Sequence, residues 1–223
     1  MKNALFGQAI AKFTAGVLLL GLLIFLPAGT FAYWQGWLLM GILFVPMFIA
    51  GLVMLKKNPE LLKRRLNARE REGEQRAVIA WSGLMFLAVF ILAGLNRRFG
   101  WCLLPGWVSL AAAAVFLLGY VLYAEVLREN AYLSRTVEVQ EGQTLIDTGL
   151  YGLVRHPMYF CTLLLFFSMP LVLASPFSFA VMLLYIPLIV KRIRNEEQVL
   201  AEGLPGYGEY QKRVKYRLLP GVW

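Results

Sequence analysis

Residues 158–190 read MYFCTLLLFFSMPLVLASPFSFAVMLLYIPLIV, an apolar stretch without a charged side chain. A helix needs roughly 20 apolar residues to span a bilayer, so this stretch is too long for one span and slightly short for two. Pro170 and the Ser175-Pro176 pair interrupt it, and proline suits both a turn and the first position of a helix. The pattern predicts a helical hairpin that turns near Ala174 to Pro176. Each arm would have about 16 residues, roughly 24 Å, and need not reach the far membrane surface.

Four further apolar stretches precede this hairpin, and each is long enough to cross a membrane as a helix. They cover about residues 13–32, 36–55, 77–95 and 107–127. Tyr33, Trp34 and Trp37 mark the turn between the first two, and such aromatic residues typically lie at the headgroup level. Segment 56–76 is rich in Lys, Arg and Glu, so we expect a polar loop there. The expected fold is all-α: a polytopic membrane helix bundle with four full transmembrane helices, a C-terminal helical hairpin and a cytoplasmic C-terminal segment.

Composition supports a membrane class. Hydrophobic residues make up 59% of the chain and charged residues only 16%, whereas a soluble domain carries about 25% charged residues. The net charge of +9 is confined to short stretches between apolar runs, which indicates lipid headgroups rather than nucleic acid as the partner. Cys102 and Cys161 form no disulfide or metal-ligand pattern. There is no Gly-rich phosphate loop, so any cofactor must be bound in another way.

The basic residues predict the orientation. We interpret the N-terminal region, with Lys2 and Lys12, as a first transmembrane helix rather than a signal peptide. If both termini are cytoplasmic, all of the 22 Lys and Arg residues except Arg97 and Arg98 lie inside, as the positive-inside rule requires. All 13 Asp and Glu residues fall on the same side. We therefore expect an integral, multi-pass protein whose polar site is on the cytoplasmic side; the sequence leaves its oligomeric state open.

Polar clusters flank the predicted hairpin. One runs from Gln143 to Tyr151, a second from Arg155 to Tyr159, and a third from Lys191 to Glu197. A hairpin returns its two ends to one membrane surface, so we expect His156 and Glu196 to be neighbours. His156-Pro157 is typical of a helix start.

Three motifs occur in order: Arg155-His156-Pro157-x-Tyr159, then Glu196-Glu197-x-x-Leu200, then Tyr207-x-x-Tyr210. Together they resemble the isoprenylcysteine carboxyl methyltransferases and the related phospholipid N-methyltransferases. The resemblance covers roughly residues 128–223, and the preceding helices match only in kind. It implies a division into a four-helix transmembrane region, 1–127, and a catalytic region, 128–223, with the cofactor motifs and the hairpin.

The resemblance implies S-adenosylmethionine as cofactor, in a pocket closed by the C-terminal segment, and a lipid substrate that enters from the bilayer. Carried over residue by residue, the cofactor pocket would be lined by Gln143, Thr144, Leu145, Ile146, Tyr151, His156, Pro157, Met158, Tyr159 and Glu196. Two positions depart from the family pattern. Gln143 stands where members often have His, and Cys161 stands where they usually have Gly.

Arg192 matches the arginine that contacts substrate at the transfer centre in the family. Methyl transfer from a sulfonium needs alignment and a dry site more than acid or base. A carboxylate acceptor is already a nucleophile, so a positioning arginine could suffice. An amine acceptor must first lose a proton, which Glu197 or a water chain could take. No metal is required or suggested.

Other interpretations of these residues stay open. Tyr207 and Tyr210 suit an interfacial anchor better than a ligand contact, Arg155 could bind lipid phosphate, and segment 56–76 favours headgroup binding. The leading hypothesis is an S-adenosylmethionine-dependent methyltransferase acting on a lipophilic acceptor. The alternatives are a membrane reductase of the sterol-reductase type, which would bind a nicotinamide dinucleotide, and a non-catalytic lipid-binding protein. Whether the acceptor atom is O, N or S is not set by the sequence.

Overall fold

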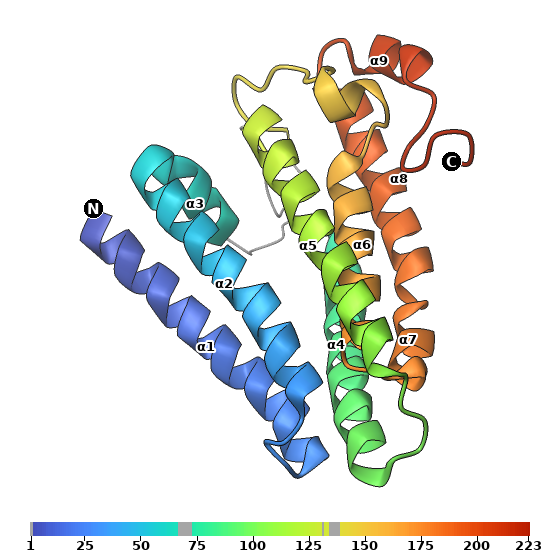
Figure 1. The fold of residues 1–223 in the computed structure, drawn as a ribbon. Coiled ribbons are helices and arrows are strands. Elements are labelled where there is room, and N and C mark those ends of the chain that lie inside the picture. Colours follow the sequence, from blue (N-terminus) through green and yellow to red (C-terminus); the bar gives the residue numbers. More distant parts are fainter. Residues whose placement is uncertain (1, 67–72, 131, 134–138) are drawn as a thin grey trace.

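The computed structural model describes residues 2–66, 73–130, 132–133 and 139–223. All regular structure in these residues is helical, as predicted. The longer helices are α1 (Lys2–Ala28), α2 (Trp34–Lys57), α4 (Gly73–Phe99), α5 (Gly106–Glu129), α6 (Pro157–Val172) and α8 (Tyr185–Gly203) (Figure 1). The shorter ones are α3 (Pro59–Leu66), the 3-10 helix η1 (Gly149–Gly152), α7 (Pro176–Met182) and α9 (Tyr207–Arg213).

The chain is a polytopic membrane protein. In the described residues, five helical segments are long and apolar enough to cross a membrane: Leu5–Ala28, Trp34–Lys57, Ala77–Phe99, Gly106–Glu129 and Pro176–Gly203. The first four contain the predicted spans or overlap most of them, and their apolar side chains face lipid, since many large hydrophobic residues are exposed. The fifth comprises α7 and α8 together.

The C-terminal hairpin forms, and its two arms differ. The first arm, α6, has 16 residues, as predicted. The second arm was expected to end near residue 190, but it continues to Gly203 and is broken at Leu183 and Leu184 between α7 and α8. Pro187 explains the break, because its ring displaces the carbonyl group of Leu183 and offers no N–H to it.

The turn of the hairpin is buried inside the bundle. Ala174 has a positive φ of 53° and, like Leu173 and Ser175, is fully buried. The Tyr33 hydroxyl donates a hydrogen bond to the carbonyl oxygen of Leu173 at 2.5 Å, and the Leu104 N–H donates one to that of Ala174 at 3.1 Å. The α1–α2 and α4–α5 loops therefore cover the hairpin tip, and α6 ends inside the protein.

The prediction of a polar loop over 56–76 is wrong for most of its length. Helix α3 begins at Pro59, the Asn58 side chain accepts a hydrogen bond from the Leu61 N–H at 3.1 Å, and Leu61 and Leu62 are buried. An Asn-Pro pair is a helix start signal that segment 56–76 contained. Helix α4 then begins at Gly73; the intervening part of the predicted loop, 67–72, lies outside the described residues.

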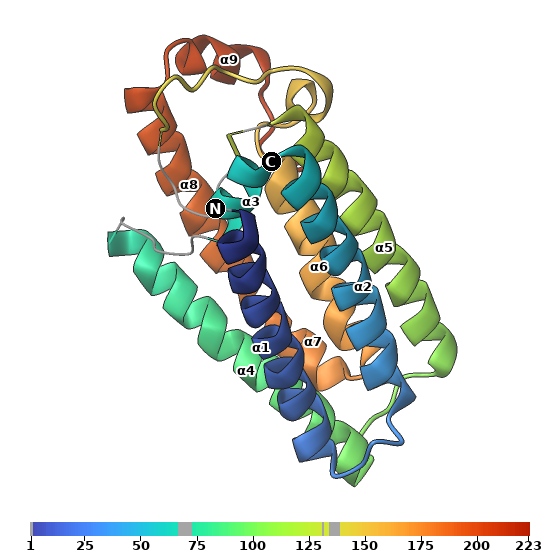
Figure 2. The ribbon, with the colours of Figure 1, turned by 90° about the vertical axis from the view of Figure 1, so that its left-hand side faces the viewer.

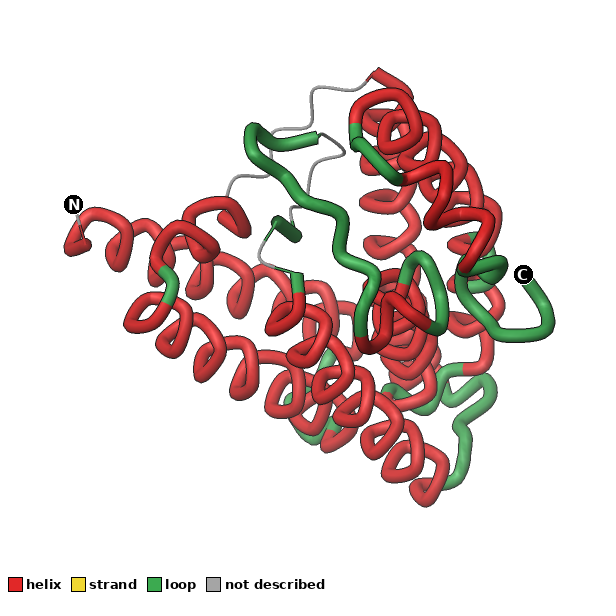
Figure 3. The backbone as a smooth tube through the Cα atoms, turned by 90° about the horizontal axis from the view of Figure 1, so that it is seen from above, coloured by secondary structure: helices red, strands yellow, loops and turns green. Residues whose placement is uncertain are grey.

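Helix packing places one polar end of the bundle together. α5 packs mainly on α6, α1 on α4, and α4 on α7. Figures 1 and 2 show α3, η1, α9 and the N-terminal end of α1 at the same end of the bundle, opposite the α1–α2 and α4–α5 loops. Seen from above, segment 139–148 crosses this end before η1 (Figure 3). The polar site is built here.

Candidate functional site

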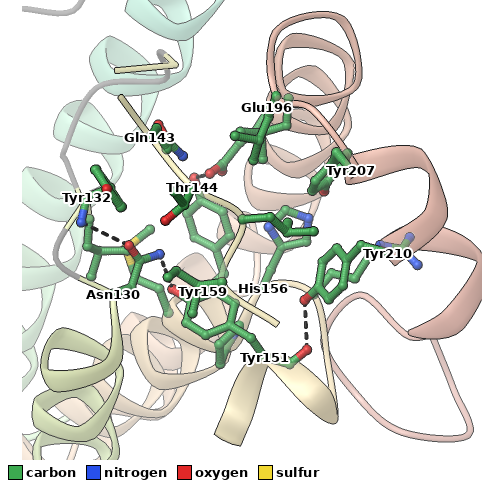
Figure 4. A pocket seen from close by; sticks show the side chains of 18 of the residues that line it. Asn130, Tyr132, Gln143, Thr144, Tyr151, His156, Tyr159, Glu196, Tyr207 and Tyr210 are labelled. Carbon is green, nitrogen blue, oxygen red and sulfur yellow. Dashed lines mark hydrogen bonds between the residues drawn. The ribbon is translucent and has the colours of Figure 1, made fainter. Parts of the chain in front are cut away.

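A cavity with about 840 Å³ of space, including the solvent at its mouth, lies at this end of the bundle (Figure 4). Its walls come from the C-terminal end of α5, the segment before η1, the N-terminal end of α6, and α8 and α9. Its lining residues are Asn130, Tyr132, Leu133, Gln143, Thr144, Leu145, Ile146, Tyr151, Arg155, His156, Pro157, Met158, Tyr159, Arg192, Glu196, Leu200, Leu204, Tyr207 and Tyr210. Every residue predicted to bind the cofactor is among them, and so is Arg192. All lining residues fall within the predicted catalytic region, 128–223.

The hairpin brings its two polar ends together at this cavity, as expected. The Tyr159 hydroxyl, on α6, donates a hydrogen bond to Glu196 Oε2, on α8, at 2.5 Å. Arg192 Nε donates to the same hydroxyl at 3.0 Å. Arg192 and Glu196 are one turn apart on α8 and so lie on one helix face. Tyr159 therefore links the predicted substrate arginine to the predicted cofactor carboxylate.

Glu197 does not line the cavity; it is the buried centre of a cluster beside it that we call the Glu197 ion-pair cluster (Arg155, His156, Glu197 and Arg217). Arg155 Nε donates to Glu197 Oε1 at 2.7 Å, and Arg217 Nε donates to Oε2 at 2.8 Å. His156 Nε2 lies 3.2 Å from Oε1. Because a carboxylate only accepts, Nε2 is the protonated ring nitrogen of His156. The cluster thus fixes the orientation of an imidazole that lines the cavity.

The same cluster joins the C-terminal segment to α6. The N–H groups of Arg155 and His156 donate to the carbonyl oxygens of Tyr216 and Arg217, both at 2.9 Å. Arg155 Nη1 also donates to the carbonyl oxygen of Val214 at 2.7 Å. The C-terminal segment therefore packs against the start of α6 and supports the cavity wall on the side away from the cavity.

The expectation that Glu197 acts as a proton acceptor finds no support in this geometry. Glu197 is not among the cavity-lining residues, it is buried, and both of its oxygens accept hydrogen bonds from arginines. Arg155 is likewise buried and paired with Glu197, so the interpretation of Arg155 as an anchor for lipid phosphate is wrong. The resemblance assigned Glu196 to the cofactor pocket, and the rotation of α8 does turn Glu196, and not Glu197, toward the cavity.

A polar network that includes one carboxylate forms the opposite wall. The Asn130 side-chain amide donates to the Tyr151 hydroxyl at 2.9 Å, and the Tyr210 hydroxyl donates to the Tyr151 carbonyl oxygen at 2.7 Å (Figure 4). Glu129 Oε2 accepts from the Leu150 N–H at the start of η1 at 3.2 Å. Gly149, with φ of 50°, leaves the space for this carboxylate, because a Cβ there would overlap with Glu129 Oε1. The Glu129 carboxylate at the end of α5 therefore fixes the position of η1, and η1 in turn positions Tyr151.

Segment 139–147 covers the cavity, and we call it the roof. The Gln140 N–H donates to Gln143 Oε1 at 2.9 Å and the Gln143 N–H donates back to the Gln140 carbonyl oxygen at 3.0 Å. The turn at 140–143 thus uses the side-chain oxygen of Gln143 and leaves its NH₂ group as the hydrogen-bonding group for a ligand. Leu145 packs with Leu204, Tyr207 and Tyr210 in one buried cluster. The roof is consequently continuous with α9.

Several lining residues were not predicted. Tyr207 and Tyr210 were interpreted as interfacial anchors, but each is only 3% exposed and both line the cavity, so that interpretation is wrong. Burial raises the pKa of Tyr151, Tyr207 and Tyr210 above the usual tyrosine value, so all three are hydrogen-bonding phenols at neutral pH. Leu200 is signalled by its spacing, since it continues the Arg192–Glu196 face of α8 at a four-residue step, whereas Leu204 follows the end of that helix.

The cavity has a charged end and a neutral end. Arg155, His156, Arg192 and Glu196 line the end formed by the start of α6 and by α8, whereas Asn130, Tyr132 and apolar side chains line the end formed by α5 and η1. A ligand with a zwitterionic group at one end and a planar heterocycle at the other matches this division. In the described part of the chain, no three His, Cys, Asp or Glu side chains are placed to hold a metal ion.

Comparison with known proteins gives a consistent picture. Residues 110–202 match the isoprenylcysteine carboxyl methyltransferase (ICMT) family. The cobalt-zinc-cadmium resistance protein CzcN of Cupriavidus metallidurans is 32% identical over 161 residues, which cover 70% of this chain and 68% of CzcN. The fold is similar to the solved structure of the eukaryotic intramembrane Ras methyltransferase ICMT, with a TM-score of 0.56 and 20% identity over 92% of this chain and 74% of that one.

Sterol reductases are also similar, over shorter stretches. The Delta(14)-sterol reductase TM7SF2 of Mus musculus is 35% identical over 91 residues, or 40% of this chain. The match spans only 22% of that reductase, and a match to the Delta(14)-sterol reductase of Methylotuvimicrobium alcaliphilum spans 32% of its length. The likeness to sterol reductases is therefore confined to part of each protein.

Proposed function

Since the chain belongs to the isoprenylcysteine carboxyl methyltransferase family, a family of membrane methyltransferases, we propose that it transfers a methyl group from S-adenosylmethionine to a lipophilic acceptor. The observation that carries this proposal is the cavity in which the two ends of the hairpin meet: Tyr159 bonded to Glu196, with Arg192 bonded to Tyr159. Bound there, S-adenosylmethionine would supply a sulfonium methyl group and a good leaving group.

The residues present fit this cofactor. Glu196 would accept hydrogen bonds from the α-ammonium group of the methionine part at the charged end. Tyr151, Leu145 and Ile146 would pack against the adenosine part at the neutral end, and Asn130 and the Gln143 NH₂ group offer hydrogen bonds to it. The remaining predicted residues, Thr144, His156, Pro157 and Met158, complete the wall between the two ends.

Arg192 is the proposed acceptor-positioning residue. Its Nε contact with Tyr159 places the guanidinium at the cavity wall beside Glu196, where a fork of N–H donors can hold a carboxylate in line with the methyl group. A carboxylate needs no deprotonation at neutral pH. Because Glu197 is buried in its ion-pair cluster, an amine or thiol acceptor would have to lose its proton to water at the cavity mouth.

We further propose that residues 128–223 carry this chemistry and that 1–127 anchors it in the bilayer. The acceptor would reach the cavity from the lipid, and the cavity and both termini would lie on the cytoplasmic side. The charge asymmetry supports this orientation, because Arg97 and Arg98 are the only basic residues at the opposite end of the sequence-predicted topology.

Isothermal calorimetry of the purified protein with S-adenosylhomocysteine tests the proposal. We expect saturable binding in the micromolar range, since the product retains every group the cavity would contact. A parallel thermal unfolding series with S-adenosylhomocysteine and with NADPH separates methyl transfer from the reductase alternative, because a ligand stabilises only the protein that binds it. Stabilisation by NADPH alone would refute the proposal, and indifference to both ligands would favour a non-catalytic lipid-binding protein.

A further inference from the structure

Tyr207 carries a buried hydroxyl group that has no hydrogen-bond partner in the described part of the chain. The residue is 3% exposed and lines the cavity, yet no partner for its hydroxyl lies within hydrogen-bond distance among the residues that the structure describes. Buried polar groups in folded proteins nearly always have a partner. Because Tyr207 lines the cavity, a ligand bound there is a candidate for the partner that its hydroxyl lacks.

Its neighbour Tyr210 shows what a structural tyrosine looks like in the same helix. Tyr210 is equally buried, lines the same cavity, and donates its hydroxyl to the Tyr151 carbonyl oxygen at 2.7 Å. The two rings pack together with centroids 5.7 Å apart. The two tyrosines lie on the same helix, are equally buried and line the same cavity. They differ in whether the hydroxyl bonds to another group among the described residues.

The surroundings of Tyr207 say which kind of group it would meet. Figure 4 places it on the side of the cavity that holds His156 and Glu196. Burial raises the pKa of Tyr207, and the charges of Glu197 and Glu196 raise it further, so the phenol stays protonated and acts as a donor. The group it lacks is an acceptor. Arg155, which also lines the cavity, carries a positive charge that favours an anionic acceptor at this end.

We propose that Tyr207 is a binding residue for the methyl donor and that its hydroxyl donates a hydrogen bond to the α-carboxylate of the methionine part. This inference rests on the proposed function. Glu196 would then take the α-ammonium group and Tyr207 the α-carboxylate, so that the two ends of the zwitterion are held by α8 and by α9. Because Tyr207 also packs with Leu145 of the roof, donor binding would tie the roof to α9.

The unpaired hydroxyl gives the variant Tyr207→Phe a distinctive signature. Removing a buried donor that has no partner relieves its desolvation penalty, so the ligand-free protein should unfold at the same or a higher temperature. Removing a hydrogen bond to a charged ligand group should weaken S-adenosylhomocysteine binding about ten- to a hundredfold. The comparison variant Tyr210→Phe removes a hydroxyl that the protein itself uses, so it should lower the unfolding temperature of the ligand-free protein, which Tyr207→Phe should not.

The experiment measures the affinity of wild type, Tyr207→Phe and Tyr210→Phe for two probes, S-adenosylhomocysteine and methylthioadenosine, which lacks the amino-acid part. A loss for Tyr207→Phe with S-adenosylhomocysteine but not with methylthioadenosine supports the assignment. Equal affinity of Tyr207→Phe and wild type for S-adenosylhomocysteine overturns it, and so does an equal loss with both probes. If wild type binds neither probe, the proposed function itself fails, which is a separate and recognisable result.

Discussion

Glu196 and Glu197 are adjacent in the chain and serve different parts of the molecule. Successive helix residues are rotated by about 100°, so the two carboxylates leave α8 in different directions. Glu196 meets Tyr159 at the cavity, whereas Glu197 meets Arg155 and Arg217 behind it. One carboxylate is therefore available to a ligand and the other binds the C-terminal segment to α6.

This difference predicts opposite results for the same substitution at the two positions. Glu197→Gln should lower the free energy of unfolding by about 3 kcal/mol or more, because it leaves the buried Arg155 without a counter-charge. Glu196→Gln should leave the fold intact and weaken S-adenosylhomocysteine binding at least tenfold, and Glu196→Ala should abolish it. Thermal unfolding measures the change in stability and calorimetry the change in affinity, both on the same preparations. Equal destabilisation by the two Gln variants would contradict the separation of roles.

Arg192 carries a second prediction at this scale. Arg192→Ala should bind S-adenosylhomocysteine within a few-fold of wild type but lose methyl transfer, because its proposed contact is with the acceptor. Arg192→Lys should recover little, since an ammonium group cannot reproduce the planar fork of donors. Incorporation of labelled methyl groups into total membrane lipid measures transfer to any lipid acceptor. A parallel loss of binding and transfer in Arg192→Ala would mean that the arginine serves the cofactor.

The sequence predicts local structure best where a residue type has a single structural role. His156-Pro157 predicted the start of α6, because a proline at the first helical position is a local signal. Prediction from the sequence failed for Tyr207 and Tyr210, since a tyrosine near a membrane surface suits an interface as well as a cavity until tertiary contacts are known. Arg217 was not singled out at all: its partner Glu197 is 20 residues away, and no periodicity connects them.

At the scale of elements, close helix contact replaces the hydrophobic effect, because lipid is as apolar as the helices themselves. Gly94 on α4 shows this most clearly. A Cβ added there would lie 2.7 Å from the carbonyl oxygen of Ile24 and 3.0 Å from the backbone nitrogen of Ala28, both on α1. These are backbone atoms, so a larger residue could be accommodated only by separating the helices.

Gly94→Ala should therefore destabilise the protein by about 1–3 kcal/mol despite the higher helix propensity of alanine. Gly83→Ala, on the same helix, is the matched control, since nothing lies within 4 Å of the added Cβ, and it should be neutral or slightly stabilising. Thermal unfolding in one detergent compares the three proteins. If the two variants behaved alike, close α1–α4 packing would not be what holds these helices together.

The elements were predictable to the extent that hydropathy defines them. The lengths of the apolar runs predict four membrane spans, and the positions of the prolines predict the hairpin turn at Ala174. The break between α7 and α8 was missed, although Pro187 was its visible cause, because an apolar run continues through it. The second arm is longer than the apolar run that predicted it. α8 continues through the charged residues after 190 to Gly203, because one of its faces, with Ile193 and Glu197, is buried by the rest of the protein.

At the scale of the whole molecule, the bundle is polar at one end. α3 and α9 share that end (Figures 1 and 2), and the cavity and the Glu197 ion-pair cluster lie there too. Arg97 and Arg98 lie near the end of α4, next to the α4–α5 loop. The hairpin tip, covered by Tyr33 and Leu104, lies toward this second end. A lipophilic acceptor would thus meet the cofactor near one membrane leaflet, since the covered hairpin tip closes the bundle toward the other end.

Two native cysteines make the orientation directly measurable. Cys102, in the α4–α5 loop, is exposed, and Cys161, on α6, is buried. If the cavity end is cytoplasmic, a membrane-impermeant maleimide added to intact cells should label Cys102 from outside, and Cys102→Ala should abolish that labelling. In the Cys102→Ala background, a cysteine introduced by Lys212→Cys on α9, whose side chain is 75% exposed, should react only after the membrane is permeabilised. The reverse pattern, with position 212 labelled in intact cells and Cys102 protected, would place the cavity outside and contradict the positive-inside assignment.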